Sequence, residues 1–428
     1  MKKFTKITGL MFAAAIMTFS FASESQAVPA FARQTGNACT TCHFQQFPLL
    51  NAFGRAFVRG GYTMVGGQSL IEGDDLSIPS TLNATLITQI QYVKTNGDSD
   101  PAAGSDNGEI KFPNEAALFL GGRVGEHIGF VLESQIGEAD ANGFTNFKMP
   151  FGFDAGVAHL EVAPFTTDGF GPSYGFELLN TGAVRQPRPT EHRSDVSAQQ
   201  YVGMTGAATG FAFVASNEMG FVNATLYVPG TESADMGTSF LNYFRVAATP
   251  QVAGWDLGIG AQLMTGTSKA EGYTGVDWND DGDMLDRGEG NNEVKANAMA
   301  FDAQAQGMVG SMPLGVYLSY AVVPKSDTTG AHNVYNSGTK KDKSAIGISA
   351  LLSVTPKTEI SVGTRQGTNN AGDSDNAIAL GVKYLIAQNV QLSLNHSIYS
   401  GDANDDPSSA AGDWDGDQKS TLMLFSAF

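Results

Sequence analysis

The stretch 390-VQLSLNHSI-398 contains the pattern that decides the fold. One face of an extended strand over these residues carries Val390, Leu392, Leu394 and Ile398, and the other carries Gln391, Ser393, Asn395 and Ser397. Residues 81–92 alternate in the same way. Such strands are typical of barrels that turn an apolar face to lipid and a polar face to a lumen. We therefore predict an all-β fold, a transmembrane antiparallel β-barrel.

The lengths of the expected connectors agree with a barrel. Short connectors are expected near 125–127, 249–254, 311–314, 355–358 and 387–389. Long polar connectors are expected near 95–112, 139–150, 184–197, 268–296, 325–343 and 401–416. Outer-membrane barrels place short turns in the periplasm and long loops outside, so with both chain ends in the periplasm residues 76–428 give about 16 strands, within a range of about 14 to 18. The count takes residues 201–216 as one long strand, and Phe428 closes the last strand.

The first 27 residues have the features of a cleavable signal peptide, with three lysines, an apolar stretch and small residues before position 28. Without them, 22 basic and 42 acidic residues remain, so the exported chain is strongly acidic. Such a chain is not expected to bind nucleic acid, and it attracts cations. No long apolar run follows residue 27. We therefore expect no transmembrane helix.

Both cysteines of the chain lie in 39-CTTCH-43. C-x-x-C-H is the attachment pattern of c-type haem. Cys39 and Cys42 would each bind one porphyrin vinyl group, and His43 would be the proximal ligand of the iron. The alternatives are a redox disulfide and half a zinc site, but no further cysteine completes a zinc site and no βαβ pattern surrounds the motif. The motif therefore predicts one covalent haem c and electron transfer.

Residues 28–75 differ from the barrel pattern. We expect a short helix or turn over residues 31–43, and a second helix that opens at Pro48 and ends at Gly60-Gly61. So short a segment cannot enclose a haem and a core of its own. The barrel lumen is the available shell. We therefore predict that residues 28–75 form a small α-helical monohaem cytochrome c segment that plugs the lumen.

Residues 29–36, 39–43, 50–57 and 61–62 resemble the fused monohaem cytochrome–porins that serve as outer-membrane Fe(II) oxidases in iron-oxidising bacteria. The motifs cover residues 29–62, and the architecture matches over the whole chain. The resemblance implies a barrel in outer-membrane lipid that oxidises extracellular Fe(II). It also implies that the electrons pass through one haem to a periplasmic c-type cytochrome. Composition and spacing do not by themselves indicate Fe(II).

The same segment contains one candidate for the distal iron ligand. Met64 would complete a Met/His pair, which raises the reduction potential of a haem. A packing role for Met64 and a five-coordinate iron are the alternatives. Three arginines flank the segment and would either pair with the haem propionates or face solvent: Arg33, Arg55 and Arg59. Among the histidines, His127 is expected in a periplasmic turn and His396 on the lipid side, whereas the face of His159 is not assigned.

The stretch 277-DWNDDGD-283 is similar to the first half of a calcium loop. Its candidate Ca²⁺ ligands are Asp277, Asn279, Asp281 and Asp283. Glu289, which would complete the loop, comes one position late. A solvated acidic loop is the alternative, and it would still raise the local concentration of Fe(II). His192 and His332 are expected to be exposed on outer loops.

Three functions are compatible with these patterns. The first is an iron-oxidising electron-transfer protein. The second is a diffusion porin whose haem segment is a structural or regulatory plug, which predicts conductance of small solutes. The third is a haem enzyme acting on peroxide or a small oxyanion, which would need an open iron position and a distal acid–base group.

Overall fold

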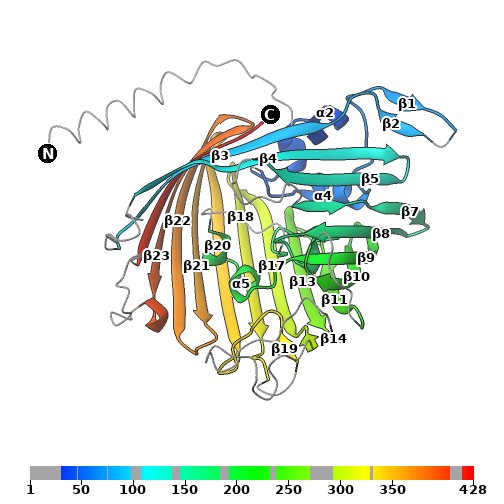
Figure 1. Ribbon diagram of the computed structural model, residues 1–428. Coiled ribbons are helices and arrows are strands. Elements are labelled where there is room, and N and C mark those ends of the chain that lie inside the picture. Colours follow the sequence, from blue (N-terminus) through cyan, green and yellow to red (C-terminus); the bar gives the residue numbers. More distant parts are fainter. Residues whose placement is uncertain are drawn as a thin grey trace, which may run out of the picture.

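A closed antiparallel β-barrel encloses the N-terminal segment of the chain in the computed structural model (Figure 1). The structure describes residues 30–45, 47–74, 76–97, 108–136, 145–183, 192–231, 238–269, 293–327, 331–404 and 417–428. The predicted fold class is therefore confirmed. The predicted signal peptide, residues 1–27, lies outside the described residues.

Sixteen strands form the barrel within the part of the chain that the structure describes. Two of them are interrupted, and each of these two carries two labels. They are β3 (Ala84–Thr95), β4 (Glu109–Gly125), β5 (Ile128–Gln135), β6 with β7 (Asn146–Lys148 and Phe151–Ala155), β8 (Ala158–Thr167), β9 (Ala208–Asn217), β10 (Gly220–Pro229), β11 with β12 (Leu241–Ala248 and Gln251–Val252), β13 (Trp255–Thr265), β17 (Ala298–Val309), β18 (Met312–Val323), β20 (Lys343–Thr355), β21 (Thr358–Thr368), β22 (Ser374–Ala387), β23 (Val390–Ser400) and β24 (Gln418–Ala427). The last strand pairs with the first, from Lys419 opposite Thr95 to Ala427 opposite Ile87, and this pairing closes the barrel.

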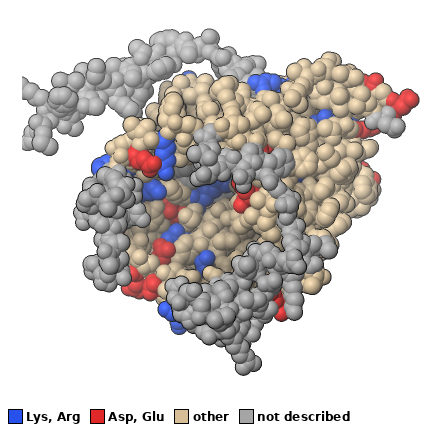
Figure 2. All heavy atoms as spheres, viewed as in Figure 1, with Lys and Arg blue, Asp and Glu red and all other residues tan. Residues whose placement is uncertain are grey.

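The two faces of the barrel wall are inverted relative to a soluble protein. On β23, Leu394 is 54% exposed, whereas its neighbours Ser393 and Asn395 are only 2% and 3% exposed. Figure 2 shows charged side chains gathered around the hollow of the barrel, beside a wall that is mostly uncharged. Closure also pairs every strand edge, which a bilayer requires because lipid offers no partner for backbone polar groups.

Connector length separates the two ends of the barrel, as predicted. Two-residue turns lie at one end: 126–127, 156–157, 218–219, 253–254, 310–311, 356–357 and 388–389. Seven longer connectors lie at the other end, which is called the loop end below: 96–108, 136–145, 168–207, 230–240, 266–297, 324–342 and 401–417. One loop-end connector, 369–373, is shorter than these.

The interpretation of residues 201–216 as one long strand is wrong. Residues 198–202 form helix α5 (Ala198–Val202), and strand β9 begins only at Ala208. The Ser197 side chain accepts a hydrogen bond from the backbone N–H of Gln200 and caps the helix, while Gly203 ends it at φ 87°. The strand count is unaffected, because β9 is still a single strand.

Residues 168–183 and 192–207, which belong to the connector between β8 and β9, turn into the lumen and are called the inward loop below. Its elements are η2 (Pro172–Tyr174), η3 (Arg193–Asp195) and α5. Helix α5 lies against β18 and β20 inside the barrel (Figure 1). The sequence predicted an outer loop near 184–197, but Asp195, Val196 and Ser197 are 4% exposed or less. Residues 184–191 lie outside the described residues.

The N-terminal segment forms a plug near the end of the barrel that carries the short turns. Its helices are α2 (Ala30–Thr35), α3 (Cys39–Cys42) and α4 (Ala52–Arg59). The Gln45 side chain donates hydrogen bonds to the carbonyls of Pro313 and Leu351, at 3.0 and 2.8 Å, and both residues lie close to short turns. The plug therefore belongs at the end that would face the periplasm.

The second helix of the plug starts later than predicted. Pro48 does not open it, because Asn51 is the cap and its side chain accepts from the backbone N–H of Gly54 at 2.9 Å. A bridge between His43 and Leu50 holds the intervening residues as a loop. The predicted end is confirmed, since α4 stops at Arg59 before Gly60.

The remaining helices and strands are not part of the barrel sheet. Strands β1 (Leu70–Glu72) and β2 (Ser77–Pro79) form a hairpin, and β14 (Thr267–Lys269), β16 (Glu293–Lys295) and β19 (His332–Asn333) form a small sheet at the loop end. A short helix, η4 (Asp402–Asn404), follows β23. Among the described residues, no helix is both long and apolar enough to span a bilayer.

Candidate haem c site

One turn of helix, α3, carries both cysteine thiols, and His43 follows it directly. The backbone N–H of His43 donates to the carbonyl of Cys39 at 2.9 Å. The His43 Nδ1 lies 3.2 Å from the carbonyl of Leu49. A proton on Nδ1 that is donated to this carbonyl leaves the lone pair on Nε2, which is the form of imidazole that binds a metal. One helical turn with two thiols and an oriented imidazole is compatible with the attachment of a c-type haem.

Cys39 and Cys42 are half-buried and do not form a disulfide. Burial raises the pKa of both thiols, and the neighbouring Cys39 raises the pKa of Cys42 further. A redox dithiol depends instead on a lowered pKa. The local environment therefore does not favour the redox-disulfide alternative. The described residues bring together no group of three or more His, Cys, Asp or Glu that could hold a metal ion.

A cavity of about 330 Å³ lies directly beside this motif. Its apolar walls come from the plug and from the barrel, and include Phe31, Phe47, Leu50, Phe57, Ile87, Phe119, Val131 and Phe425. Phe31 stacks on Tyr62 at a centroid distance of 5.2 Å, and the His43 ring lies 5.4 Å from the ring of Phe47. A flat, largely apolar group with polar substituents on one edge fits such a cavity. The residues present therefore fit a covalent haem.

The polar part of the cavity wall carries charges of both signs. It includes Gln89 and the charged residues Glu115, Glu133, Lys148 and Arg193. Gln89 donates to the Glu115 carboxylate, and the Asn146 side chain donates to Glu133 at 3.0 Å. Arg193 belongs to the inward loop, as do the lining residues Phe170 and Tyr174. The inward loop therefore roofs the cavity from the side of the loop end.

The inward loop and the plug are also fastened to each other. The Asn180 side chain accepts from the backbone N–H of Leu50 at 2.7 Å and donates to the Leu50 carbonyl at 2.9 Å. Phe176, Leu178 and Leu179 of the loop pack in one apolar cluster with Phe57, Val58 and Tyr62 of the plug. Moving the loop would therefore disturb the cavity.

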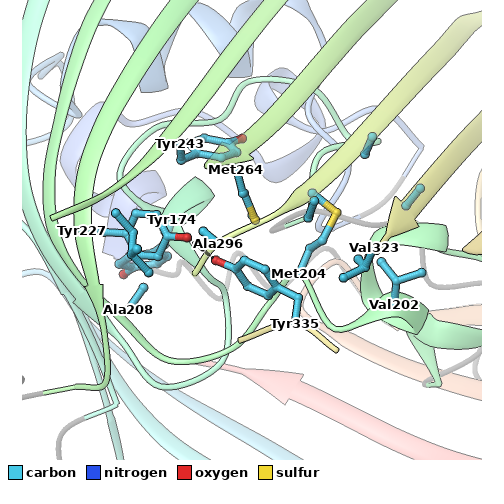
Figure 3. Close-up of a cluster of buried hydrophobic side chains, with 14 of the residues drawn as sticks. Tyr174, Val202, Met204, Ala208, Tyr227, Tyr243, Met264, Ala296, Val323 and Tyr335 are labelled. Atoms are coloured by element: carbon cyan, nitrogen blue, oxygen red, sulfur yellow. Dashed lines mark hydrogen bonds between the residues drawn. The ribbon is translucent and has the colours of Figure 1, made fainter. Parts of the chain in front are cut away.

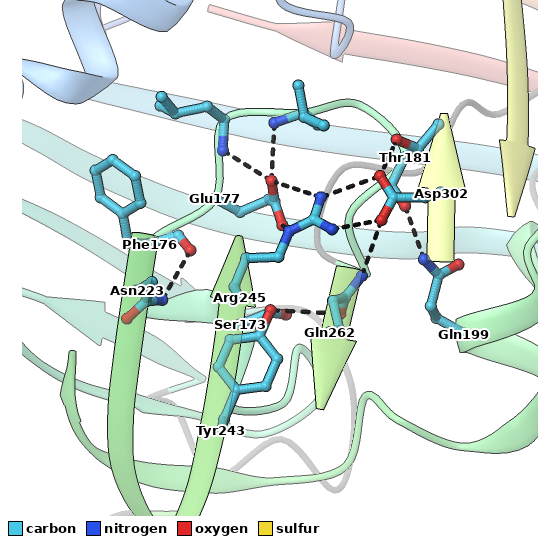
Figure 4. A network of polar contacts seen from close by, with 12 residues as sticks. Ser173, Phe176, Glu177, Thr181, Gln199, Asn223, Tyr243, Arg245, Gln262 and Asp302 are labelled. Carbon is cyan, nitrogen blue, oxygen red and sulfur yellow. Dashed lines mark hydrogen bonds and ion pairs between the residues drawn. The ribbon is translucent and has the colours of Figure 1, made fainter. Parts of the chain in front are cut away.

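A buried ion cluster holds the inward loop to the wall (Figure 4). Arg245 of β11 bonds to Glu177 of the loop at 3.0 Å and to Asp302 of β17 at 3.0 Å. The Glu177 carboxylate also accepts from the backbone N–H groups of Leu178 and Leu179. All three charged side chains are buried. These side chains occupy the part of the lumen between the inward loop and strands β11 and β17.

Toward the loop end, aromatic and methionine side chains form a buried cluster between the inward loop and the wall (Figure 3). Tyr174 and Met204 of the inward loop pack in one cluster with Tyr227 of the wall and Tyr335 of the connector 324–342. The hydroxyls of Tyr227 and Tyr335 are 2.5 Å apart. This cluster extends from the cavity roof to a loop-end connector.

Four residues proposed from the sequence lie away from the cavity lining. Met64 is 39% exposed, and its carbonyl accepts from Gln34. The guanidinium groups of the three predicted propionate partners bond to the wall: Arg33 to the carbonyl of Ala84, Arg55 to the Asp256 carboxylate at 2.7 Å, and Arg59 to the carbonyl of Asn217 at 2.9 Å. Arginines near the haem motif are thus used to dock the plug.

The histidines occupy different environments. His127 lies in a short turn and His396 shares the outward face with Leu394, as predicted. His159 faces the lumen and bonds to Asp154 at 2.9 Å. His332 was expected to be exposed but is 5% exposed, because β19 packs in the small loop-end sheet, and burial lowers its pKa. The calcium candidates Asp277, Asn279, Asp281 and Asp283 lie outside the described residues.

Lys148 and Arg193 were missed by the sequence reasoning. Lys148 follows a long connector in a three-residue strand, where alternation is too short to assign a face. Arg193 lies in a connector that the sequence placed outside the barrel.

Comparison with known proteins supports the barrel and says nothing of the plug. No protein-family model matches the chain, and no curated protein does. Among solved structures, Pseudomonas putida OprB has a TM-score of 0.50 at 12% identity, over 81% of this chain and 94% of its own. An anion-selective porin from Comamonas acidovorans has a TM-score of 0.49 at 16% identity, over 81% of this chain and 99% of its own. At these identities the likeness concerns the fold alone, which is a porin-like outer-membrane β-barrel.

Proposed function

We propose that this chain is an outer-membrane electron-transfer protein that carries one covalent haem c. The proposed donor is extracellular Fe(II), and the proposed acceptor is a periplasmic c-type cytochrome. One observation carries the proposal: the 39-CTTCH-43 turn borders an apolar cavity that the plug, the wall and the inward loop enclose together. The identity of the donor rests on the resemblance in residues 29–62.

The residues of the chain would hold the haem in defined ways. The Sγ–H groups of Cys39 and Cys42 would add across the two vinyl groups, which forms two thioether bonds without net oxidation. His43 would bind the iron through Nε2, with the ring oriented by the Leu49 carbonyl. The bound haem would supply reversible one-electron transfer.

The surroundings of the cavity suit a conduit between two compartments. On the short-turn side, Phe47 is 42% exposed, lies beside His43 and stacks on Phe425 of β24 at 5.7 Å. This edge is where a periplasmic acceptor could approach. On the other side, the inward loop, which the buried Arg245 cluster holds to the wall, occupies part of the lumen and narrows it. Fe(III) formed outside would thereby stay outside.

The second candidate is a diffusion porin with a structural or regulatory haem plug. The observation that favours it is the likeness of the barrel to solved porins. It predicts substantial conductance of small ions through the wild-type protein. The inward loop, which occupies part of the lumen beside Arg245, favours the conduit instead, because a diffusion porin needs a continuous aqueous path.

The test is anaerobic mixing of the purified protein with Fe(II), followed by the absorbance of reduced haem c. Fe(II)-dependent reduction, absent from a Cys39→Ser/Cys42→Ser variant, is the expected result. A haem that ascorbate reduces but Fe(II) does not, at acidic or neutral pH, would refute the iron assignment. Conductance in planar bilayers tests the porin in the same preparation, and open wild-type channels without Fe(II)-dependent reduction would establish it.

A further inference from the structure

Lys148 is a buried cation that makes no direct ion pair with a carboxylate among the described residues. Five Lys or Arg residues are buried among those that the structure describes. Four of them form ion pairs: Arg55 with Asp256 at 2.7 Å, Arg245 with Glu177 at 3.0 Å, Arg365 with Asp375 at 2.5 Å and Lys383 with Glu359 at 3.4 Å. Lys148, 5% exposed, makes no such pair within 4.0 Å of the described residues.

The contacts of the Lys148 ammonium group are neutral. It donates to the Tyr174 carbonyl at 3.0 Å and lies 4.7 Å from the centroid of the Tyr174 ring and 5.5 Å from that of Tyr62. Glu161 of β8 attracts it from beyond ion-pair distance. An unpaired buried charge costs several kcal/mol, and aromatic faces offset only part of that. A carboxylate in direct contact with the Lys148 ammonium group would therefore stabilise it further.

A second cation, Arg193, lies beside an aromatic pair that Tyr174 forms with Phe170. The rings of Tyr174 and Phe170 are stacked, with centroids 5.8 Å apart and an interplanar angle of 16°. The Arg193 guanidinium lies 5.6 Å from the Phe170 centroid. Lys148, Tyr174, Phe170 and Arg193 all line the cavity beside the cysteine motif. The cavity wall thus presents two cations, one on either side of an aromatic stack.

We propose that Lys148 and Arg193 are positioning residues that hold the two propionate carboxylates of the covalent haem. The proposal rests on the proposed haem c function. Haem is the one group expected here that is apolar over its faces and carries two carboxylates on one edge. Lys148 belongs to the wall and Arg193 to the inward loop, so two binding carboxylates would also join these parts. Glu115 and Glu133 also line the cavity, and Glu161 lies near enough to Lys148 to attract it. These carboxylates would repel a propionate, so Lys148 and Arg193 are the groups expected to attract it.

The test compares Lys148→Met and Arg193→Met with Arg59→Met, a matched control whose guanidinium bonds to the wall. Covalent haem is first confirmed by haem staining of the denatured protein. The reduction potential is then measured by spectroelectrochemistry from acidic to neutral pH. Loss of a cation beside a propionate favours the ferric state, so at the wild-type midpoint the ratio of reduced to oxidised haem should fall about tenfold in each test variant.

The pH dependence provides the reading that a structural role would not give. A propionate without its cation has a higher pKa, so the potential of Lys148→Met should fall with rising pH over a range where wild type is flat. Lys148→Arg should restore both properties, and it also covers the case in which the methionine variant does not fold. Folded Lys148→Met and Arg193→Met proteins with wild-type potentials and pH profiles would overturn the assignment. A wild-type protein without covalent haem would instead overturn the function on which it rests.

Discussion

Replacing Arg245 by Met should open the lumen, because Arg245 ties the inward loop to the wall. Its guanidinium bonds to Glu177 on the loop and to Asp302 on β17, and the Arg245 and Asp302 side chains are fully shielded from solvent. The variant leaves two carboxylates buried without a cation. Breaking a buried pair in this way costs about 3–5 kcal/mol. If that free energy is released by loop movement, the closed form loses about a hundredfold or more in population relative to the open form.

The pH dependence of this effect has a definite sign. Burial raises the pKa of Glu177 above that of an exposed carboxyl, and Arg245 opposes the shift. Without Arg245 the pKa of Glu177 rises further, so the folded state binds this proton more tightly than the unfolded chain does. The stabilising effect of protonation is complete below the unfolded pKa and is lost as pH rises through the folded pKa. The Arg245→Met variant should therefore be closed at acidic pH and open at neutral pH.

The assay is single-channel conductance in planar bilayers, with limited proteolysis of the inward loop as a second reading. The triple variant Arg245→Met/Glu177→Gln/Asp302→Asn is the matched control, because it removes all the charges and should regain much of the closed population. Arg245→Lys should restore only part of it, since one ammonium cannot engage both carboxylates as the guanidinium does. An Arg245→Met protein with wild-type conductance and protease resistance at neutral pH would refute the reasoning.

Three further predictions concern the plug. Gly54→Ala should abolish covalent haem, because a Cβ there would lie 2.1 Å from the Cys42 carbonyl oxygen. Gly60→Ala is the control and should keep the haem, because its Cβ would have no neighbour nearer than 3.5 Å. Equal haem staining of the two variants would contradict this prediction. Asn180→Ala should lower the free energy of unfolding by about 1–3 kcal/mol, because it leaves the buried backbone N–H and carbonyl of Leu50 without their hydrogen-bond partner. An unchanged denaturant midpoint would argue against this link between the inward loop and the plug. Met64→Leu should leave the haem spectrum and potential unchanged, because Met64 lies outside the cavity lining; a shifted potential would restore it as the distal ligand.

The barrel was predictable because its pattern is local and repeated. Alternation over residues 390–398 assigns lipid and lumen faces without any knowledge of the neighbours, and connector lengths then assign the ends. The inward loop was not predictable in this way. Its burial comes from long-range bonds, such as Glu177 to Arg245 and Asn180 to Leu50, whose partners lie 68 and 130 positions apart in the sequence.

The candidate site was predictable only in its core. Cys39, Cys42 and His43 follow from one contiguous motif. The cavity around them combines the plug, the inward loop and strands from the beginning and the end of the barrel sequence. Nearness in sequence suggested Arg33, Arg55 and Arg59 as charge partners, yet the plug needs those cations to dock. Lys148 and Arg193 reach the cavity through tertiary structure, which spacing along the chain does not encode.

The pairing of β24 with β3 has a consequence for the order of haem attachment and barrel closure. The cavity is bordered by residues of both the last and the first strand: Phe425, Ala427, Thr85 and Ile87. It is therefore incomplete until β24 pairs with β3 and the barrel closes. In the closed barrel, the cavity that Cys39 and Cys42 border is enclosed by the plug, the wall and the inward loop. For a chain that carries the proposed haem, attachment before the barrel closes is therefore the expected order. Pulse-labelled cells lacking the attachment machinery should accordingly accumulate barrels that later restoration of that machinery cannot convert to the haem-bearing form.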